Sequence, residues 1–408
     1  GLESGMEPLL AETDADTRGA AIGWLLAHGA GARERAQTLL EGPDPELRAL
    51  ALDVLLARPG LLPTIVTAPW VDRLIQTGVE ADLWAAARSL GLLDHGAAEK
   101  RLRILLDHPL IEVRRAALLS AARRPSPGLL DPLIARLVEP ELAQEGLQAV
   151  AALGQAAVPA LAALTDGARG PLARARACDT LARIGNRSAI AALLRVARSD
   201  DPRARYDGLR ALNRMRVRSA SGLVKKSLAF RLWQRELDDL RANLLPAHIL
   251  HGATDPRVAL LASSFAESAD RALDRSCRAL ACYYRPEPFR SVYRYLQNPG
   301  APKATARSLE YLSQLIPRRR FGALRELFEN PQPFEGTEAE PSDGQVAGCI
   351  ETAYAMGDAW LRACAVRAAH ALLGRIAIKF AAHPDEDDIV RAELAAYHAA
   401  RSEEGVPA

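Results

Sequence analysis

Five arginines lie within residues 200–216, the segment DDPRARYDGLRALNRMR, interleaved with leucine, alanine and tyrosine. Guanidinium groups bind phosphates and carboxylates through paired hydrogen bonds, so this segment could hold a polyanion or an acidic partner. The wider range 169–235 contains 17 Lys and Arg residues against 4 acids. The basic residues that we expect to face a partner or a polyanion are Arg174, Arg176, Arg203, Arg210, Arg214, Arg216, Lys225 and Lys226.

Three other pairs of reactive side chains lack the neighbours that catalysis or metal binding requires. They are the carboxylates Asp238 and Asp239, the imidazoles His248 and His251, and the thiols Cys277 and Cys282. The carboxylates lie in a polar stretch, where nothing indicates the raised pKa that an acid catalyst needs. The imidazoles have no further ligand at a matching spacing, and thiols of this kind pack as small hydrophobes. We therefore expect no catalytic residue, no metal and no cofactor.

The arginine-rich segment is one copy of a repeat in which proline recurs every 31 residues, each time before a run rich in alanine and leucine. The prolines are Pro109, Pro140, Pro171 and Pro202. Second apolar segments lie between these runs, for example at 129–138 and 189–198. Units of helix, turn, helix and turn with a period of about 30 to 50 residues are typical of α-solenoids.

Each unit carries the signals of helices that must share their core with a neighbour. An acid beside a proline can cap the exposed N–H groups of a first turn, in which proline itself fits well. Apolar residues at i, i+3, i+4 and i+7 make a face that one helix pair cannot bury alone, so successive pairs must stack. Gly154 and Gly185 are placed to end helices in the left-handed conformation. The sequence therefore predicts an all-α fold, an α-α superhelix.

These units resemble the HEAT-repeat family, and the resemblance is clear over about residues 10–225. It implies that an acid before the proline and an arginine a few residues later form a polar ladder along the inner helices. The matching residues are Asp44, Arg48, Asp107, Arg114, Asp201 and Arg205. The copy at 139–154 has Gln144 and Glu145 near the place of the arginine, so we expect the ladder to be interrupted there.

The strict period lapses after about residue 225, which divides the chain into four parts. Residues 1–225 are the expected repeat array, and residues 226–330 predict longer, less regular helices that continue the solenoid. Residues 331–345, PQPFEGTEAEPSDGQ, predict a polar loop. Residues 346–408 contain a last repeat-like helical unit and an acidic tail that we expect to fray.

The second half bears a more specific resemblance, carried by RYDGLRALNRMR, LDRSCRALACYYRPEPFRSVYRYLQNPGAPKATARSLEYLSQLIP and GDAWLRACAVRAA. These runs resemble a bacterial arrangement in which a HEAT segment lies between an ATP/ADP-translocase-like membrane domain and a cyclic-nucleotide-binding domain. Neither flanking domain lies within these 408 residues. The resemblance implies a module at the cytoplasmic face of the membrane, as part of a longer protein.

The distribution of charge, the cysteines and the lengths of apolar runs indicate the kind of environment in which the chain works. Residues 101–236 hold 24 basic and 12 acidic residues, a net charge of +12, and the remainder holds 28 and 38, a net charge of −10. Five irregularly spaced cysteines without a CxxC motif favour a reducing compartment. No apolar run approaches the roughly 18 residues that span a bilayer.

We therefore expect a cytoplasmic, non-catalytic scaffold that binds a protein partner or adjoining domains. One alternative is a nucleic-acid-binding solenoid that uses the basic face of residues 169–235, a zone that an anionic lipid surface or an acidic partner could also bind. A third is a HEAT-type lyase or DNA glycosylase, although no Trp–Arg–Asp cluster can be placed in this sequence. Nucleic-acid binding predicts an affinity that falls steeply with rising salt concentration.

Overall fold

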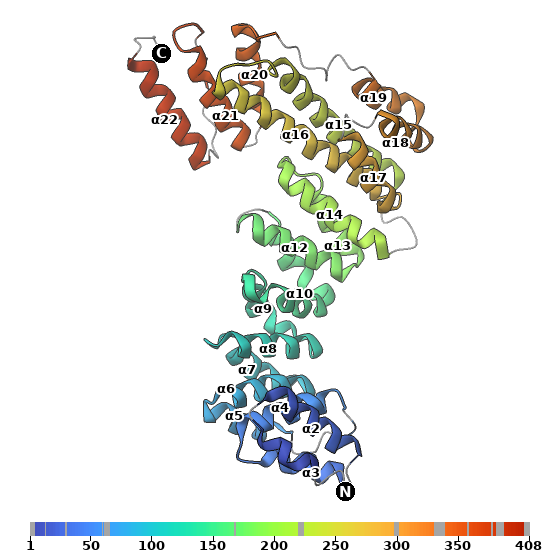
Figure 1. Cartoon of the computed structure of the whole chain (residues 1–408), viewed down its shortest axis with the longest axis vertical. Coiled ribbons are helices and arrows are strands. Elements are labelled where there is room, and N and C mark those ends of the chain that lie inside the picture. The colour runs from blue at the N-terminus through green and yellow to red at the C-terminus, as the bar shows by residue number, and fades with distance from the viewer. Residues whose placement is uncertain are drawn as a thin grey trace. The chain divides into compact units, whose positions relative to one another are not determined.

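The computed structural model describes residues 5–12, 14–28, 31–58, 60, 66–166, 169–218, 224–297, 302–329, 339–356, 359–376, 378–380 and 387–403. Within these residues helices are the only regular secondary structure, and no strand occurs (Figure 1). Successive helices pack on their neighbours in the chain. The fold is therefore all-α and solenoid-like, as the repeat predicts.

The chain divides into two compact units, Gly1–Ala192 and Leu193–Ala408, which we call unit 1 and unit 2. The division falls inside one helix, earlier than the lapse of the sequence period near residue 225. The cause is that the last clear sequence repeat packs on helices of the second half, as described below.

Unit 1 is a series of short helices joined by tight turns. Its helices are α2 (Ala15–His28), α3 (Ala32–Glu41), α4 (Pro45–Leu56), α5 (Ala68–Thr77), α6 (Glu80–Ser89), α7 (His95–Leu106), α8 (Ile111–Arg123), α9 (Leu130–Leu137), α10 (Ala143–Ala152), α11 (Val158–Leu164) and α12 (Gly170–Ile184), and α13 (Arg187–Val196) crosses the division. Short 3₁₀ helices lie at Glu7–Ala11, Leu90–Leu92, Pro127–Leu129, Pro140–Leu142 and Gly154–Ala157.

The helices of unit 1 form hairpins stacked in chain order. The even-numbered helices from α2 to α12 each pack on the next even-numbered helix, and the odd-numbered helices pack against them. Leu118, Ala149 and Thr180, which lie one repeat apart, are all fully buried. The apolar face that a single hairpin would leave wet is thus covered by the next hairpin, which is the burial that the periodicity requires.

Local signals set several helix ends where the sequence places them. Asp44 accepts hydrogen bonds from the N–H groups of Glu46 and Leu47 and so caps α4, whose first residue is Pro45. Gly154 (φ 57°) and Gly185 (φ 71°) adopt left-handed backbone conformations at the ends of α10 and α12. Only glycine takes this conformation without steric cost, so both helices stop there.

Unit 2 has longer helices. They are α14 (Pro202–Arg218), α15 (Lys226–Ile249), α16 (Pro256–Ala281), α17 (Pro286–Leu296), α18 (Pro302–Leu315), α19 (Arg318–Glu329), α20 (Asp343–Ala355), α21 (Ala359–Ala369) and α22 (Asp388–Glu403), with a short 3₁₀ helix at His370–Leu372. Helices α15 and α16 form a long hairpin, and α16 also packs on α14, α17 and α21. The repeat copy in α14 therefore belongs to this unit.

The loop and tail expected near the C-terminal end differ in part from the structure. Residues 331–338 of the loop lie outside the described residues, and α20 begins at Asp343, before the expected end of the loop. The hydroxyl of Ser342 accepts the N–H of Gln345 at 3.4 Å, while the Gln345 side chain accepts the N–H of Ser342 at 2.9 Å. These reciprocal bonds form a capping box that starts the helix.

The tail also packs where fraying was expected. Helix α22 lies on α21, and the Tyr397 ring is 1% exposed. Its hydroxyl donates a hydrogen bond to the carbonyl of Ile378 at 3.2 Å. One buried tyrosine with a satisfied hydroxyl thus anchors a strongly charged segment.

No single helix among those described is long and apolar enough to cross a bilayer. The segments Pro140–Ala152 and Gly154–Leu164 meet the length and composition criteria only together, and a bend of 115° separates them.

Gly208 of α14 lies against the backbone at the end of α13. A Cβ atom at this position would stand 2.7 Å from the Ala197 nitrogen and 3.0 Å from the Leu193 carbonyl oxygen. Gly348, inside α20, would have no described atom within 4 Å of its Cβ. Close packing therefore requires glycine at 208, whereas position 348 has room for a side chain.

Gly208→Ala is expected to lower the free energy of unfolding by about 1–3 kcal/mol, because backbone atoms must move to admit the methyl group. Gly348→Ala, the matched control in the same unit, should raise it by about 0.5–1 kcal/mol, since alanine favours helix over glycine. Urea denaturation followed by circular dichroism measures both. Effects of the same sign would contradict the close approach at Gly208.

Asp255 caps α16 and predicts a pH dependence of stability. Its carboxylate accepts hydrogen bonds from the Arg257 N–H at 2.8 Å and from the Arg257 guanidinium, at 3.1 Å from Nε and 2.8 Å from Nη2. The guanidinium bonds, followed by the backbone bond, lower the pKa of Asp255 from 3.8 to about 2. Because the folded pKa is lowered, the stabilising effect is complete above 3.8 and is lost as the pH falls towards 2.

Asp255→Asn keeps a capping oxygen but removes the charge. The variant should be less stable than the wild type above about pH 5, and the difference should shrink between about pH 4 and pH 2. Urea denaturation at a series of pH values measures the difference. A difference that stays constant over that range would show that the charge of Asp255 contributes nothing.

Candidate functional site

Arginines of unit 1 reach carboxylates on the next hairpin. Arg18 of α2 bonds Asp44 at 2.7 Å and Glu46 at 3.0 Å, at the start of α4. Arg48 of α4 bonds Asp82 in the first turn of α6. The arginine side chains are 9% and 11% exposed, so these contacts lie between stacked helices. Each ion pair joins one hairpin to the following one.

Asp44 and Arg48, which the sequence places in one repeat of the ladder, therefore pair with different hairpins. Their partners Arg18 and Asp82 were not among the expected residues. Arg18 follows Asp14 by four residues, as Arg48 follows Asp44, so that spacing could have revealed it. Asp82 has no such signal, because no arginine follows it at that spacing.

Two arginines of the ladder, Arg48 and Arg114, also close the turn before their own helix. Arg48 donates a hydrogen bond to the carbonyl of Gly42 at 2.7 Å. Arg114 donates to the carbonyls of His108 and Pro109, both at 2.8 Å. Carbonyls after a helix end have no helical partner, and the guanidinium has enough donors to serve them and a carboxylate together.

Asp107 and Arg114 take separate partners too. Asp107 bonds Arg136 of α9 at 3.2 Å, whereas Arg114 reaches Glu139 at 3.5 Å. Glu139 also bonds Arg136. The copy at 139–154, where an interruption was expected, thus supplies a carboxylate to the ladder, but its helix α10 contains no arginine that could continue it.

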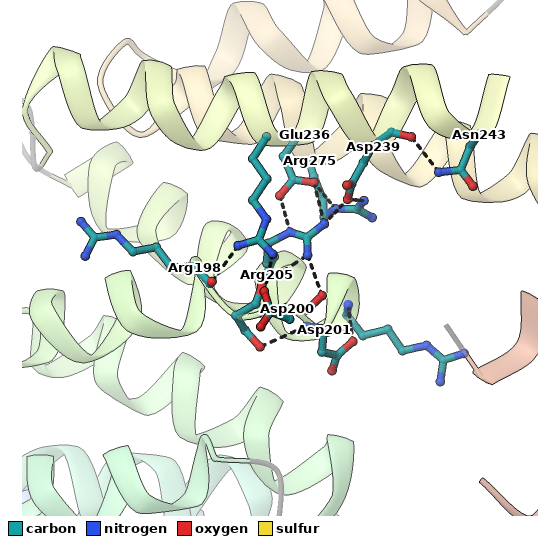
Figure 2. Close-up of polar contacts among 11 residues, drawn as sticks. Arg198, Asp200, Asp201, Arg205, Glu236, Asp239, Asn243 and Arg275 are labelled. Atoms are coloured by element: carbon teal, nitrogen blue, oxygen red, sulfur yellow. Dashed lines mark hydrogen bonds and ion pairs between the residues drawn. The ribbon is translucent and has the colours of Figure 1, made fainter. Parts of the chain in front are cut away.

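The densest ionic contact lies inside unit 2, where three helices meet around Arg205 of α14 (Figure 2). Its Nε donates to Glu236 of α15 at 2.6 Å, and its Nη2 bonds Asp239 one turn further on. Arg275 of α16 approaches the same two carboxylates, with Nε 2.6 Å from Glu236 and Nη2 3.2 Å from Asp239. Two arginines and two carboxylates therefore share one site.

The turn before α14 adds further contacts to this cluster. Arg205 donates to the carbonyls of Ser199 at 3.3 Å and Asp200 at 2.9 Å, which repeats the turn-closing role of Arg48 and Arg114. The carboxylate of Asp201 accepts the N–H of Arg203 at 2.8 Å at the start of α14. Figure 2 shows Asp201 beside this turn, and Arg205 between the turn and the carboxylates of α15.

Burial makes this cluster electrostatically demanding. The Arg205, Glu236 and Arg275 side chains are 2%, 1% and 5% exposed, and Asp239 is 30% exposed. Removing such charges from water costs several kcal/mol per ion, so each needs a close partner of opposite sign. The equal number of positive and negative groups supplies these partners. With its guanidinium donors directed at carboxylates and turn carbonyls, the arrangement is suited to locking helices together.

Asp238 and Asp239 differ in environment, contrary to their shared assignment to a polar stretch. Asp238 is exposed and accepts a hydrogen bond from Gln234 at 3.1 Å. Asp239 turns into the cluster, where burial raises its pKa, opposed first by the nearby charge of Arg205. The expectation that nothing raises the pKa of this pair is therefore wrong for Asp239. Adjacent positions on a helix point about 100° apart, which explains the difference.

The partners of Arg205 could not be found from spacing. Glu236, Asp239 and Arg275 follow Arg205 in the sequence by 31, 34 and 70 residues. The first of these distances equals the repeat length, yet α15 lacks the acid–proline signal that marks the other copies.

The basic residues expected to face a partner differ in exposure. Arg203, Arg214, Lys225 and Lys226 are exposed. Arg176 and Arg210 are partly buried, and Arg176 donates to the carbonyl of Leu137 at 2.9 Å. Only part of the set therefore lies on the surface.

Arg174 and Arg216 differ from the expectation, because their side chains are buried at 7% and 8% exposure. Arg216 follows the buried Leu212 by one helical turn and donates to the carbonyl of Tyr283 at 3.2 Å. Charge in the sequence marked these residues as surface groups, but their position on the inner helix face places them in the core.

The histidine and cysteine pairs show no common site. His248 is partly buried and His251 is exposed. The described residues include no group of three or more His, Cys, Asp or Glu side chains arranged to hold a metal ion. All five cysteines are buried, and burial raises the pKa of Cys282 to about 12, which keeps it protonated at neutral pH.

Comparisons with known proteins give no family. No family model matches the chain, and no curated protein matches it. Among solved structures, an engineered protein matches with TM-score 0.33 and 18% identity, over 91% of this chain and 98% of its own. A second engineered protein has TM-score 0.25 and 19% identity, with coverages of 53% and 96%.

Human deoxyhypusine hydroxylase in complex with glycerol also matches, with TM-score 0.23 and 18% identity, over 67% of this chain and 96% of its own. None of these likenesses is close enough to support an inference about this chain.

Glu236→Ala is expected to lower the free energy of unfolding by about 3–5 kcal/mol, because it leaves Arg205 and Arg275 buried without their shared partner. Asp238→Ala, two residues away on the exposed face, should change it by less than about 0.5 kcal/mol. Urea denaturation measures both variants. Glu236→Gln keeps the side-chain shape without the charge and serves as a second variant if alanine prevents folding. Equal stability of all variants would contradict the locking role.

Proposed function

We propose that this chain is a non-catalytic, HEAT-type scaffold that presents a row of stacked hairpins to a protein partner or to adjoining domains. The observation that carries the proposal is the ladder of unit 1, in which Arg18 and Arg48 each tie one hairpin to the next. Stacks of this kind contact only their neighbours, and they offer long surfaces that repeat along the chain. Such surfaces are commonly used for binding.

One edge of unit 1 supports this use. Among its described residues, the exposed large apolar side chains are Val79, Ile104, Leu110 and Leu172, which are 37–61% exposed. Val79 and Leu110 precede α6 and α8, Leu172 lies in the first turn of α12, and Ile104 lies near the end of α7. In stacked hairpins, the first helices begin at the edge where the second helices end. Exposed apolar side chains that recur along one edge could contact a protein partner.

The finer form of the proposal is a regulatory module of a larger, transporter-like membrane protein, working at its cytoplasmic face. Its support is the resemblance of residues 205–216, 273–317 and 357–369 to the bacterial HEAT segment described above. In that setting the stack would relay a signal between a sensor and a membrane domain.

The competing functions receive less support. Nucleic-acid binding by the basic face of residues 169–235 would require its basic side chains to lie at the surface, yet Arg174 and Arg216 are buried. No observation in the described part of the chain favours a lyase or glycosylase.

The test replaces apolar residues at the unit 1 edge. Leu110→Asp combined with Leu172→Asp should lower the recovery of proteins cross-linked to the chain in its source cells by about tenfold, the effect of losing about 1.4 kcal/mol of interface energy. Leu245→Asp, which alters a 56% exposed leucine of unit 2, is the control. Quantitative cross-linking mass spectrometry measures the recovery. Equal recovery with the double variant and the control would overturn the proposal for this edge.

A further inference from the structure

A second basic zone lies in unit 2 on α17, α18 and α19, outside the zone that the sequence singled out. Residues 285–325 contain nine Lys and Arg residues against two Glu residues. The exposed basic residues of this zone include Arg285, Arg290, Arg294, Lys303, Arg307, Arg318, Arg319 and Arg320. A dense basic surface of this kind is the electrostatic footprint of a polyanion site.

These basic residues differ from the ladder arginines. Arg48 is partly buried and Arg205 is buried, and both have carboxylates as partners. Among the described residues, by contrast, no ion pair joins Arg290, Arg294 or Arg307 to an acid. Their charge is therefore directed to solvent and is available to an anion.

A shallow pocket of about 290 Å³ lies between α17 and α18 within this zone. Val292, Tyr295 and Tyr311 provide apolar and aromatic walls, while Ser291, Ser308 and Arg307 provide polar groups. The ring of Tyr295 is 48% exposed. The volume is at the lower end of the range for small-molecule sites, which suits one planar ring system with a few hydrogen-bonding groups.

Further charges stand beside the pocket. Arg294 follows Ser291 by three residues, and Lys303 precedes Arg307 by four, so each lies one helical turn from a pocket residue on the same side of its helix. Thr305 of α18 donates to the carbonyl of Tyr295 at 3.1 Å and ties the two helices together beside the opening.

A row of largely buried aromatic rings links this pocket to the start of α15. Tyr311 lies 6.2 Å from Phe289, which lies 6.0 Å from Tyr284. The Lys226 ammonium then lies 6.0 Å from the ring of Tyr284 and 5.9 Å from that of Phe230.

Arg320 of α19 extends the row on its other side, with its guanidinium 5.3 Å from the Phe230 ring. Cations placed over aromatic rings stay close to them. Phe289 and Phe230 are 2% and 3% exposed, so this row supports the zone from the core, and the groups that face solvent are the Tyr295 ring of the pocket and the cations Lys226 and Arg320.

We propose that the exposed basic residues of this zone and the α17–α18 pocket bind single-stranded nucleic acid, with one base in the pocket against Tyr295 and the phosphates along Arg307, Arg294 and Lys226. The inference goes beyond the scaffold function, which concerns an edge of unit 1. Proteins that bind single strands combine a basic track with aromatic rings on which bases stack. A flat lipid surface would use the charges but would leave the pocket empty, and a paired base could not enter it.

Fluorescence anisotropy with a fluorescein-labelled oligo(dT) of 20 nucleotides, in 50 mM salt, tests the proposal on the full chain. Tyr295→Ala should weaken binding about tenfold through lost stacking, and Arg307→Ala should weaken it by a similar factor. Arg391→Ala, which alters an arginine of α22 that is 61% exposed, should leave it unchanged. Raising the salt to 200 mM should weaken wild-type binding about fiftyfold if about four phosphates are contacted. Thermal melting confirms that each variant folds.

Two further probes separate stacking from charge alone. An abasic oligonucleotide of the same length should bind about as weakly to the wild type as oligo(dT) binds to Tyr295→Ala. Equal binding of the abasic and oligo(dT) strands, or an unchanged affinity of Tyr295→Ala, would overturn the proposal. So would binding to vesicles of phosphatidylserine and phosphatidylcholine without binding to oligo(dT), because this would assign the zone to a membrane surface.

Discussion

Burial of one apolar face between successive hairpins is the constraint on which the rest of the structure depends. No hairpin of unit 1 can cover its own apolar face, so each even-numbered helix packs on the next. Such stacking brings polar turns and helix ends close to the core, where unpaired groups are costly. The arginines of the ladder supply hydrogen-bond and ion-pair partners for these polar groups. Arg48 and Arg205 show the same solution in the two units: each closes its own turn and pairs with an acid on another hairpin.

The ionic contacts of the two units differ in how many charged groups are buried together. In unit 1 the ion pairs of Arg18 and Arg48 each join two hairpins, and the acids differ in exposure: the Asp44 side chain is 46% exposed, whereas that of Asp82 is 3% exposed. In unit 2 the ladder ends in a buried group of four charges that ties α14, α15 and α16 together. The desolvation penalty is larger there, and so is the dependence of each charge on the others. Among the described residues, no ion pair joins the surface arginines Arg290, Arg294 and Arg307 to an acid, which favours a binding role for them.

The sequence predicted the features that depend on local signals. Helix starts at Pro45 and Pro202 and the end of α12 at Gly185 all follow from nearby residues. The sequence could not predict the partners that an arginine finds on another hairpin. Its periodicity shows that Arg205 occupies a repeated position, but it does not show that Glu236 and Arg275 contact Arg205 or share its site. Charge alone also misled at Arg174 and Arg216, since composition does not show which side of a helix is covered.

The ladder of unit 1 has a consequence for how such a chain can evolve. Because Arg18 and Arg48 take their acids from the following hairpin, and Arg48 also serves its own turn, duplication of the whole α4 hairpin would leave these charges with counterparts. Loss of half a hairpin would not. The four-membered group of unit 2 has fixed membership, so this part cannot lengthen in the same way. The protein thus combines a segment whose length can drift by gene duplication with one whose size is constrained.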